Sequence, residues 1–132
     1  MKSDLIVSGR AFIDGELKEV EIGVKNGKIS YIGPTAIGSE ERIIADRDSI
    51  ILPGGIDPHV HFRDPGLTHK EDFETGSKSA IYGGITCVLD MPNTDPQTVD
   101  KSSLIEKKEH LKGRSYCDFG LMVAITEKGI PS

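Results

Sequence analysis

Apolar and β-branched residues in the first fifty positions form short runs, at residues 5–8, 20–25, 28–32 and 42–45, which are separated by turn residues. Asn26-Gly27 and Asp14-Gly15 are two of these turns. Asn-Gly in particular favours a two-residue hairpin, because both central residues of that turn adopt positive φ. Short runs separated in this way indicate strands. We therefore expect antiparallel β structure in residues 1–50.

From residue 50 onward, apolar runs alternate with stretches of helical periodicity. The runs lie at residues 50–61, 85–91 and 119–125. Strands that alternate with helices are typical of parallel β/α units. The spacing of the runs is close to the roughly 31 residues per unit of a β/α barrel, which has about 250 residues in eight units. The sequence therefore predicts about three consecutive units of such a barrel.

Local signals predict where the two intervening helices begin and end. The first is expected to begin at Thr68, where Thr68 and Glu71 form a capping-box pair, and to end at Gly83-Gly84. The second is expected to begin after Asp100 and to end at Gly113. The residues predicted to face inward are Phe73, Ser77, Ala80 and Ile81 in the first helix and Leu104, the stem of Lys108 and Leu111 in the second.

Three parallel strands do not form a closed structure. Their outer edges and apolar faces stay uncovered, which a stable domain rarely tolerates. We therefore expect this chain to be a fragment of a larger barrel, and we expect self-association or a complementary chain to complete it.

Composition excludes several classes of function. The formal net charge of -5 argues against a nucleic-acid or anionic-membrane surface, which would need a basic patch. No run approaches the roughly 18 apolar residues of a membrane span. The two cysteines, Cys87 and Cys117, lie in or beside apolar runs and are expected to be buried thiols in a reducing compartment. These observations favour a cytoplasmic protein.

The most informative segment is Asp57-Pro-His-Val-His-Phe-Arg-Asp-Pro65, which lies at the end of the apolar run of residues 50–61. Successive side chains of a strand point to opposite faces, so His59, His61 and, if the strand continues, Arg63 share one side. Two imidazoles at this spacing suit one Zn²⁺ ion. Alternating histidines also occur on ordinary half-exposed strands, and that alternative stays open on the spacing alone.

Three motifs together resemble those of the dihydroorotases, which are cyclic amidohydrolases. They are Leu52-Pro-Gly-Gly-Ile-Asp-Pro-His-Val-His-Phe-Arg-Asp-Pro-Gly66, Gly83-Gly-Ile-Thr86 and Asp90-Met-Pro-Asn-Thr94. The resemblance implies an α/β fold in which residues 1–50 are the N-terminal part of a β-sandwich domain. It implies that residues 51–132 are the first three β/α units of an incomplete TIM-like (β/α)8 metal-dependent hydrolase barrel.

The resemblance also implies roles for four residues. His59 and His61 resemble the two first-strand zinc ligands of the family, and Arg63 and Asn93 resemble its binders of a substrate carboxylate. A guanidinium offers two parallel donors to a carboxylate, and an amide adds a neutral donor. The structural alternatives are a surface salt bridge from Arg63 to Asp64 and a plain turn role for Asn93.

The activity implied for the complete enzyme is the interconversion of N-carbamoyl-L-aspartate and dihydroorotate in pyrimidine biosynthesis. The remaining metal ligands and the general acid/base of the family lie on later strands, so we expect no catalytic residue within this chain and no activity of the isolated chain. Two other functions stay open. One is a hydantoinase, dihydropyrimidinase or allantoinase type of cyclic amidohydrolase, and the other is a non-catalytic partner protein.

Other polar residues receive no functional role from the sequence. His110 is expected on a polar helix face, and Lys107-Lys108 is expected to be solvated. His69, Glu40-Glu41 and Glu71-Asp72 are interpreted as ordinary surface groups. Asp57 is expected to make a structural hydrogen bond near Pro58.

Overall fold

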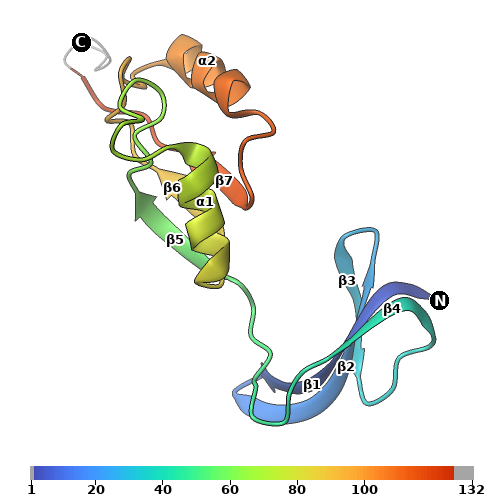
Figure 1. Cartoon of the computed structure of the whole chain (residues 1–132). Helices are drawn as coiled ribbons and strands as arrows, with labels where there is room; N and C mark the ends of the chain where they lie inside the picture. Colours follow the sequence, from blue (N-terminus) through green and yellow to red (C-terminus); the bar gives the residue numbers. More distant parts are fainter. Residues whose placement is uncertain (1, 127–132) are drawn as a thin grey trace. The chain divides into compact units, whose positions relative to one another are not determined.

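The computed structural model describes residues 2–126, and the chain divides into two compact units, Met1–Pro53 and Gly54–Ser132 (Figure 1). The first unit is all β, and the second combines a parallel sheet with two helices. The chain is therefore a mixed α/β protein with a β-rich first part. Within residues 2–126, neither helix has the length and apolar character needed to cross a membrane.

The first unit is a four-stranded sheet in the order β3-β2-β1-β4. Its strands are β1 (Ser3–Ile13), β2 (Glu16–Lys25), β3 (Lys28–Gly33) and β4 (Ser39–Ile44). Both expected turns are confirmed, because Asp14-Gly15 joins β1 to β2, Asn26-Gly27 joins β2 to β3, and all four residues have positive φ. Hairpins of this kind fix the register of the first three strands.

The expectation that this unit is wholly antiparallel is wrong for β4, which pairs with β1 in parallel. The strand order explains the difference. β4 lies at the edge beside β1, so residues 34–38 carry the chain from the β3 edge to the opposite edge instead of reversing it in a hairpin. The sheet is therefore mixed.

The second unit has the expected parallel sheet, with strand order β5-β6-β7. Its elements are β5 (Gly55–Val60), α1 (Phe73–Tyr82), β6 (Ile85–Asp90), α2 (Lys101–Leu111) and β7 (Asp118–Leu121). Helices follow the first two strands of the sheet. The described residues thus contain two β-strand–helix repeats and a further strand.

Two of the expected strands are shorter than predicted. β5 begins at Gly55 rather than at residue 50, because Ile51 pairs with β1 of the first unit, where its N–H donates to the carbonyl of Arg10 at 2.7 Å. It ends at Val60, one residue before His61. β7 ends at Leu121 rather than at residue 125. Leu121, opposite Asp90, is the last residue of β7 that pairs with β6.

Helix α1 begins five residues later than predicted. Its N-cap is Asp72, whose carboxylate accepts the backbone N–H of Thr75 at 2.8 Å. The proposed capping pair at Thr68 and Glu71 is wrong, because Thr68 lies in a separate turn and the Glu71 carboxylate instead accepts the N–H of Asp72. The predicted N-cap of α2 is confirmed, since Asp100 accepts the N–H of Ser103 at 2.8 Å.

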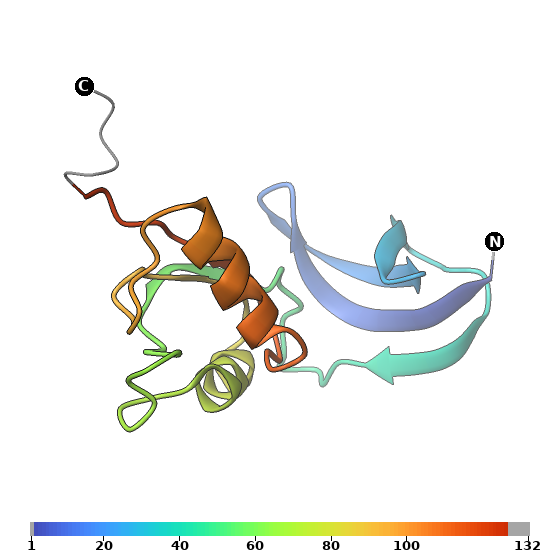
Figure 2. The same ribbon diagram turned by 90° about the horizontal axis from the view of Figure 1, so that it is seen from above.

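A single apolar core joins both helices to one face of the sheet. Phe73 of α1 is fully buried and makes edge-to-face contacts with Phe62 and Phe119, with ring centroids 5.0 and 4.9 Å apart. Val88 of β6 and Leu111 of α2 complete this cluster. Figure 2 shows α1 and α2 beside the strands from a second direction. The core therefore lies next to the segment that carries the candidate site residues, since Phe62 belongs to both.

The inward faces of the helices are partly as predicted. Phe73, Ser77 and Leu111 are fully buried, whereas Ile81 is 41% exposed. On α2 the expected inward residue Lys108 is exposed, and Lys107 is buried in its place. The prediction that Lys107 is solvated is therefore wrong, and the reason is the ion pair described below.

Candidate active site

His59 and His61 lie at the carboxyl end of β5. His59 is in the strand and His61 is the first residue after it. Their rings lie 5.1 Å apart between centroids, inclined at 69°, and both side chains are exposed. The sheet therefore brings the two imidazoles together on one side of the strand end, in positions that solvent reaches.

Asn93 lies in the loop after β6 and contacts His61. Its Oδ1 is 2.9 Å from Nδ1 of His61. Because an amide oxygen only accepts, Nδ1 carries the proton in this arrangement, and the lone pair of the ring is on Nε2. A hydrogen bond of this kind fixes the tautomer and orientation that a metal-binding histidine needs. The amide NH₂ of Asn93 remains a donor for another group.

Arg63 follows two residues later, in a left-handed backbone conformation with φ of 63°. This conformation costs about 1–2 kcal/mol for a residue with a side chain. The sequence placed Arg63 on the strand face of the histidines if the strand continued, but β5 has ended and the left-handed turn sets its direction. The side chain is half-buried, and no hydrogen bond or ion pair holds its guanidinium within residues 2–126.

The alternative of a salt bridge between Arg63 and Asp64 is wrong. Asp64 is 1% exposed and its carboxylate is taken by other donors. Nε2 of His110 and a guanidinium nitrogen of Arg114 each lie 2.8 Å from its oxygens, and the N–H of Phe73 donates at 3.2 Å. Burial acts to raise the pKa of Asp64, but the bonds from His110 and Phe73 and the charge of Arg114 outweigh it and lower the pKa below 3.8.

His110 therefore has a defined partner, although the sequence assigned it none. Its Nε2 also lies 2.8 Å from a nitrogen of Arg114. A single ring nitrogen cannot donate to one group and accept from the other. Donation to the buried carboxylate of Asp64 is favoured, since an unprotonated Nε2 would place a lone pair against that charge. His110 and Arg114 then both act as donors to Asp64.

A second buried carboxylate, Asp90, ends β6. Its Oδ1 accepts the N–H of Phe62 at 2.9 Å, and its Oδ2 accepts from Nζ of Lys107 at 2.7 Å. Asp90 is fully buried and Lys107 is 3% exposed. Removing one partner of such a pair leaves an uncompensated buried charge, at a cost of about 3–5 kcal/mol. The burial of Lys107 is thus explained by Asp90.

The loops after β5 and β6 are joined directly. The N–H of Asp95 donates to the carbonyl of Pro65 at 3.1 Å, and the N–H of Met91 donates to the carbonyl of Val60 at 2.9 Å. Gly66 has φ of 87°, and a Cβ at this position would lie 2.0 Å from the carbonyl oxygen of Asp95. Only glycine allows this close approach of the two loops, which follow parallel strands that end at the same edge of the sheet.

The donor set fits two ligands of a metal ion and not a complete site. Within residues 2–126, no group of three His, Cys, Asp or Glu side chains is placed to hold a metal. Asp57 makes the structural bond expected of it, because its Oδ1 accepts the N–H of His59 at 3.0 Å. His69 is exposed. The pair His59 and His61 is therefore the only candidate among the residues that the sequence suggested.

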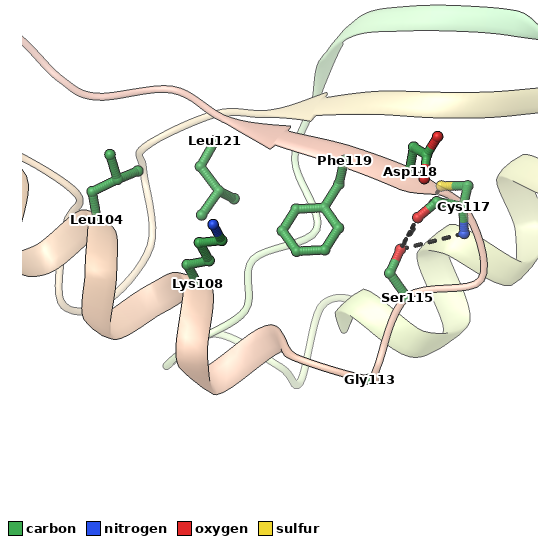
Figure 3. Close-up of a pocket in the computed structure, with 8 residues that line it drawn as sticks. All are labelled: Leu104, Lys108, Gly113, Ser115, Cys117, Asp118, Phe119 and Leu121. Carbon is green, nitrogen blue, oxygen red and sulfur yellow. Dashed lines mark hydrogen bonds between the residues drawn. The ribbon is translucent and has the colours of Figure 1, made fainter.

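A groove of about 560 Å³ lies elsewhere in the second unit, between α2 and β7 (Figure 3). None of the candidate site residues lines it. Its walls carry three apolar side chains, Leu104, Phe119 and Leu121, beside polar ones. The lining residues are Leu104, Lys108, Gly113, Ser115, Cys117, Asp118, Phe119 and Leu121.

Sequence reasoning missed the two buried carboxylates, Asp64 and Asp90, and their partners on and just after α2. One signal was available. Lys107 and His110 are three residues apart, which places them on one face of α2, whereas Arg114 lies beyond Leu111, the last residue of the helix. An aspartate also occurs near the end of each of the first two strands, as Asp64 and Asp90.

Comparisons with known proteins identify one family and two kinds of similar enzyme. Residues 50–125 match the amidohydrolase family. Two similar proteins are the dihydroorotases of Pyrococcus abyssi, 42% identical over 118 residues, and of Methanothermobacter thermautotrophicus, 50% identical over 103 residues. These alignments cover 89% and 77% of this chain but only 29% and 23% of those proteins. The chain thus spans less than a third of the length of these relatives.

Solved structures with a similar fold are named as hydantoinases. The L-hydantoinase (dihydropyrimidinase) from Arthrobacter aurescens is 34% identical, with a TM-score of 0.83. The D-hydantoinase (dihydropyrimidinase) from Thermus sp. is 30% identical, with a TM-score of 0.72. The two alignments cover 90% and 94% of this chain but only 27% and 29% of the two hydantoinase chains.

Proposed function

The chain belongs to the amidohydrolase family, and we propose that it forms the first part of a zinc-dependent dihydroorotase. The proposed reaction is the interconversion of N-carbamoyl-L-aspartate and dihydroorotate. Support comes from the names of the similar proteins, which cover most of this chain, and from the residues at the ends of β5 and β6.

The fold assignment is a part of this proposal. β5, β6 and β7 are the first three strands of a (β/α)8 barrel, with α1 and α2 on its outer side. The sheet of the first unit is a part of a β-sandwich. The domain boundary expected near residue 50 is close to Pro53, where the first compact unit ends. Active sites of β/α barrels lie at the carboxyl ends of the strands, where His59, His61, Arg63 and Asn93 occur.

The two histidines are the proposed zinc ligands from this chain. Both rings are exposed, and His61 has the protonation pattern that leaves Nε2 available. When bound, zinc supplies a Lewis acid for the amide carbonyl and lowers the pKa of its water to about 7. A catalytic zinc site normally has three protein ligands, so at least one further ligand must come from outside the described residues.

The observation that carries the dihydroorotase assignment is the pair of unused donors beside the histidines. No described residue accepts from the guanidinium of Arg63 or from the NH₂ of Asn93, while the Asn93 oxygen orients His61. A fork of two parallel N–H donors and an adjacent amide suit a substrate carboxylate. Both reactants of dihydroorotase carry such a carboxylate. Arg63 and Asn93 thus bind and orient the substrate, and neither transfers a proton.

The 132-residue chain alone is expected to have no activity, because it supplies two ligands and no general acid/base at the site. The open sheet edges and the groove between α2 and β7 are expected to pair with a second copy or with a complementary chain. Light scattering that finds a stable monomer would contradict the expected pairing. Turnover by the purified chain, lost in His61→Ala, would contradict the expected inactivity.

A hydantoinase activity is the second candidate, favoured by the fold of the L-hydantoinase with its TM-score of 0.83. The rings that such enzymes open generally lack the carboxylate, so Arg63 would have no partner in the substrate. The two candidates therefore differ in what Arg63→Lys does. Dihydroorotase turnover should show a strongly raised KM, since a lysine cannot make the parallel pair of bonds, whereas hydantoin turnover should be unaffected.

The experiment assays carbamoyl aspartate, dihydroorotate and hydantoin with the chain joined to whatever sequence the gene encodes beside it. Dihydroorotase turnover should be abolished by His61→Ala and retained in His69→Ala, a matched exposed histidine from the following loop. Turnover of hydantoin alone would replace the first candidate by the second. No turnover of any of the three compounds would indicate a non-catalytic protein.

A further inference from the structure

Three basic side chains, Lys107 and His110 of α2 and Arg114 in the segment after it, contact carboxylates behind the candidate site. Lys107, His110 and Arg114 contact two buried carboxylates, Asp90 and Asp64, which belong to the strand end and loop around the site. We call these five residues the α2 clasp. Among the described residues, the clasp makes no side-chain contact with the rings of His59 and His61 or with the guanidinium of Arg63.

We propose that the α2 clasp is a positioning element, which holds His61 and Arg63 in the orientation needed to bind metal and substrate. This inference rests on the proposed function for the roles of those two residues. The clasp acts through the backbone, because Asp90 accepts the N–H of Phe62, the residue between them, and Asp64 is the residue after Arg63.

The geometry around Arg63 supports this inference. Its left-handed backbone is unfavourable, and such a conformation persists only where neighbouring contacts determine it. Here the residues on both sides are fixed. Phe62 is held by Asp90 and by its contact with Phe73, while Asp64 is held by the N–H of Phe73 and by the side chains of His110 and Arg114.

Stability alone does not account for the clasp. Replacing a buried ion pair by apolar residues of similar volume is often neutral or stabilising, so Lys107 and Asp90 are a poor way to strengthen a core. An apolar residue at position 90 would, however, remove the acceptor for the N–H of Phe62. The other ion pair of this helix, Lys112 with Glu109, is exposed on the surface and reaches no site residue.

The test compares Lys107→Met with Lys108→Met in the 132-residue chain. Both variants remove one positive charge from adjacent positions of α2, but only Lys107 contacts Asp90. If Lys107→Met does not fold, the double variant Asp90→Asn/Lys107→Met replaces it. That double variant is compared with Asp90→Leu/Lys107→Met, which is equally uncharged but has no acceptor for Phe62.

Two readouts are measured by NMR. The first is hydrogen exchange of the Phe62 amide relative to that of Val88 in the core, and the second is the response of the His59 and His61 rings to added ZnCl₂. We expect Lys107→Met, in which the uncompensated Asp90 carboxylate must turn to water and release the N–H of Phe62, to accelerate Phe62 exchange about 10- to 100-fold relative to Val88. The Asp90→Leu double variant, which has no acceptor, should do the same. We expect either variant to weaken the zinc response by about tenfold. Lys108→Met and the Asp90→Asn double variant should resemble the parent in both.

The proposal is overturned if Phe62 exchange changes no more than that of Val88, since the clasp would then only add global stability. It is also overturned if Lys107→Met and Lys108→Met weaken zinc binding equally, because the effect would be one of net charge. If the parent rings do not respond to zinc, the proposed metal site fails, and the selective exchange of Phe62 still decides whether the clasp fixes the backbone.

Discussion

Replacing Asp64 by asparagine should destabilise the second unit strongly at neutral pH and progressively less as the pH falls below about 4. The carboxylate is 1% exposed and accepts from Phe73, His110 and Arg114. Asparagine has nearly the same shape and keeps one oxygen for the N–H of Phe73. Its NH₂ group then replaces a carboxylate oxygen and must face a donor, either His110 or Arg114, which loses its acceptor.

The magnitude follows from these contacts. A hydrogen bond to a charged group contributes about 1.5–3 kcal/mol. One such bond is lost in full, and a second is weakened because the new side chain is neutral. Solvent reduces both effects, since the side chains of His110 and Arg114 are 45% and 33% exposed. We therefore expect the free energy of unfolding to fall by about 2–4 kcal/mol at pH 7.

The pH dependence has a definite sign. The folded pKa of Asp64 is lowered from its ordinary value, because the bonds from His110 and Phe73 and the charge of Arg114 outweigh burial, and the unfolded value is about 3.9. Such a carboxylate contributes its stability above the unfolded pKa and loses it as the pH falls through the folded pKa. The difference between parent and variant should therefore be present in full at neutral pH and should shrink below about pH 4.

Urea unfolding followed by NMR measures this difference for each unit separately. Signals of Val88 report on the second unit and signals of Ile6 on the first, both from fully buried residues. Asp118→Asn is the matched control, because Asp118 is exposed, and it should change stability by less than about 0.5 kcal/mol. A loss below about 1 kcal/mol at pH 7, or an equal loss at pH 3, would refute the reasoning.

Three further predictions concern the loops and the core. Gly66→Ala should cost roughly 2 kcal/mol or more in urea unfolding, because its Cβ meets Asp95, whereas Gly113→Ala, with positive φ but open space, should cost about 1 kcal/mol. Phe73→Ala should cost about 3–5 kcal/mol in the same measurement, and a smaller loss would mean that the core collapses around it. Asn93→Ala should weaken the zinc response of the His61 ring about tenfold, and an unchanged response would exclude an orienting role.

The features that sequence reasoning predicted correctly are those that local chemistry decides. Asn26-Gly27 and Asp14-Gly15 are turns because few other residues adopt positive φ in both central positions. Asp100 caps α2 because its carboxylate reaches an N–H only three residues away. The parallel order of β5, β6 and β7 follows from helices long enough to return the chain to the same end of the sheet.

Features that depend on distant partners were predicted poorly. Thr68 has the residues of a capping box, but the loop after β5 turns back on itself there, with the N–H of Leu67 bonded to the carbonyl of Arg63. The apolar run from residue 50 suggested one strand, but Ile51 pairs with the first unit. The bond at Leu67 spans only four residues, whereas the bond from Ile51 to Arg10 joins distant parts of the chain, and each decides between two locally acceptable structures.

In the candidate site, too, some features follow from local sequence and others from distant contacts. Proximity of His59 and His61 follows from two-residue spacing at a strand end, which the sequence shows directly. The direction of Arg63 does not, because it depends on Asp90 and Asp64 and, through them, on α2. A lysine between charged neighbours is normally a solvated residue, so nothing local distinguishes Lys107 from Lys108. Substitutions that impair the site without touching substrate should therefore concentrate on the buried face of α2, in positions that sequence patterns assign to the surface.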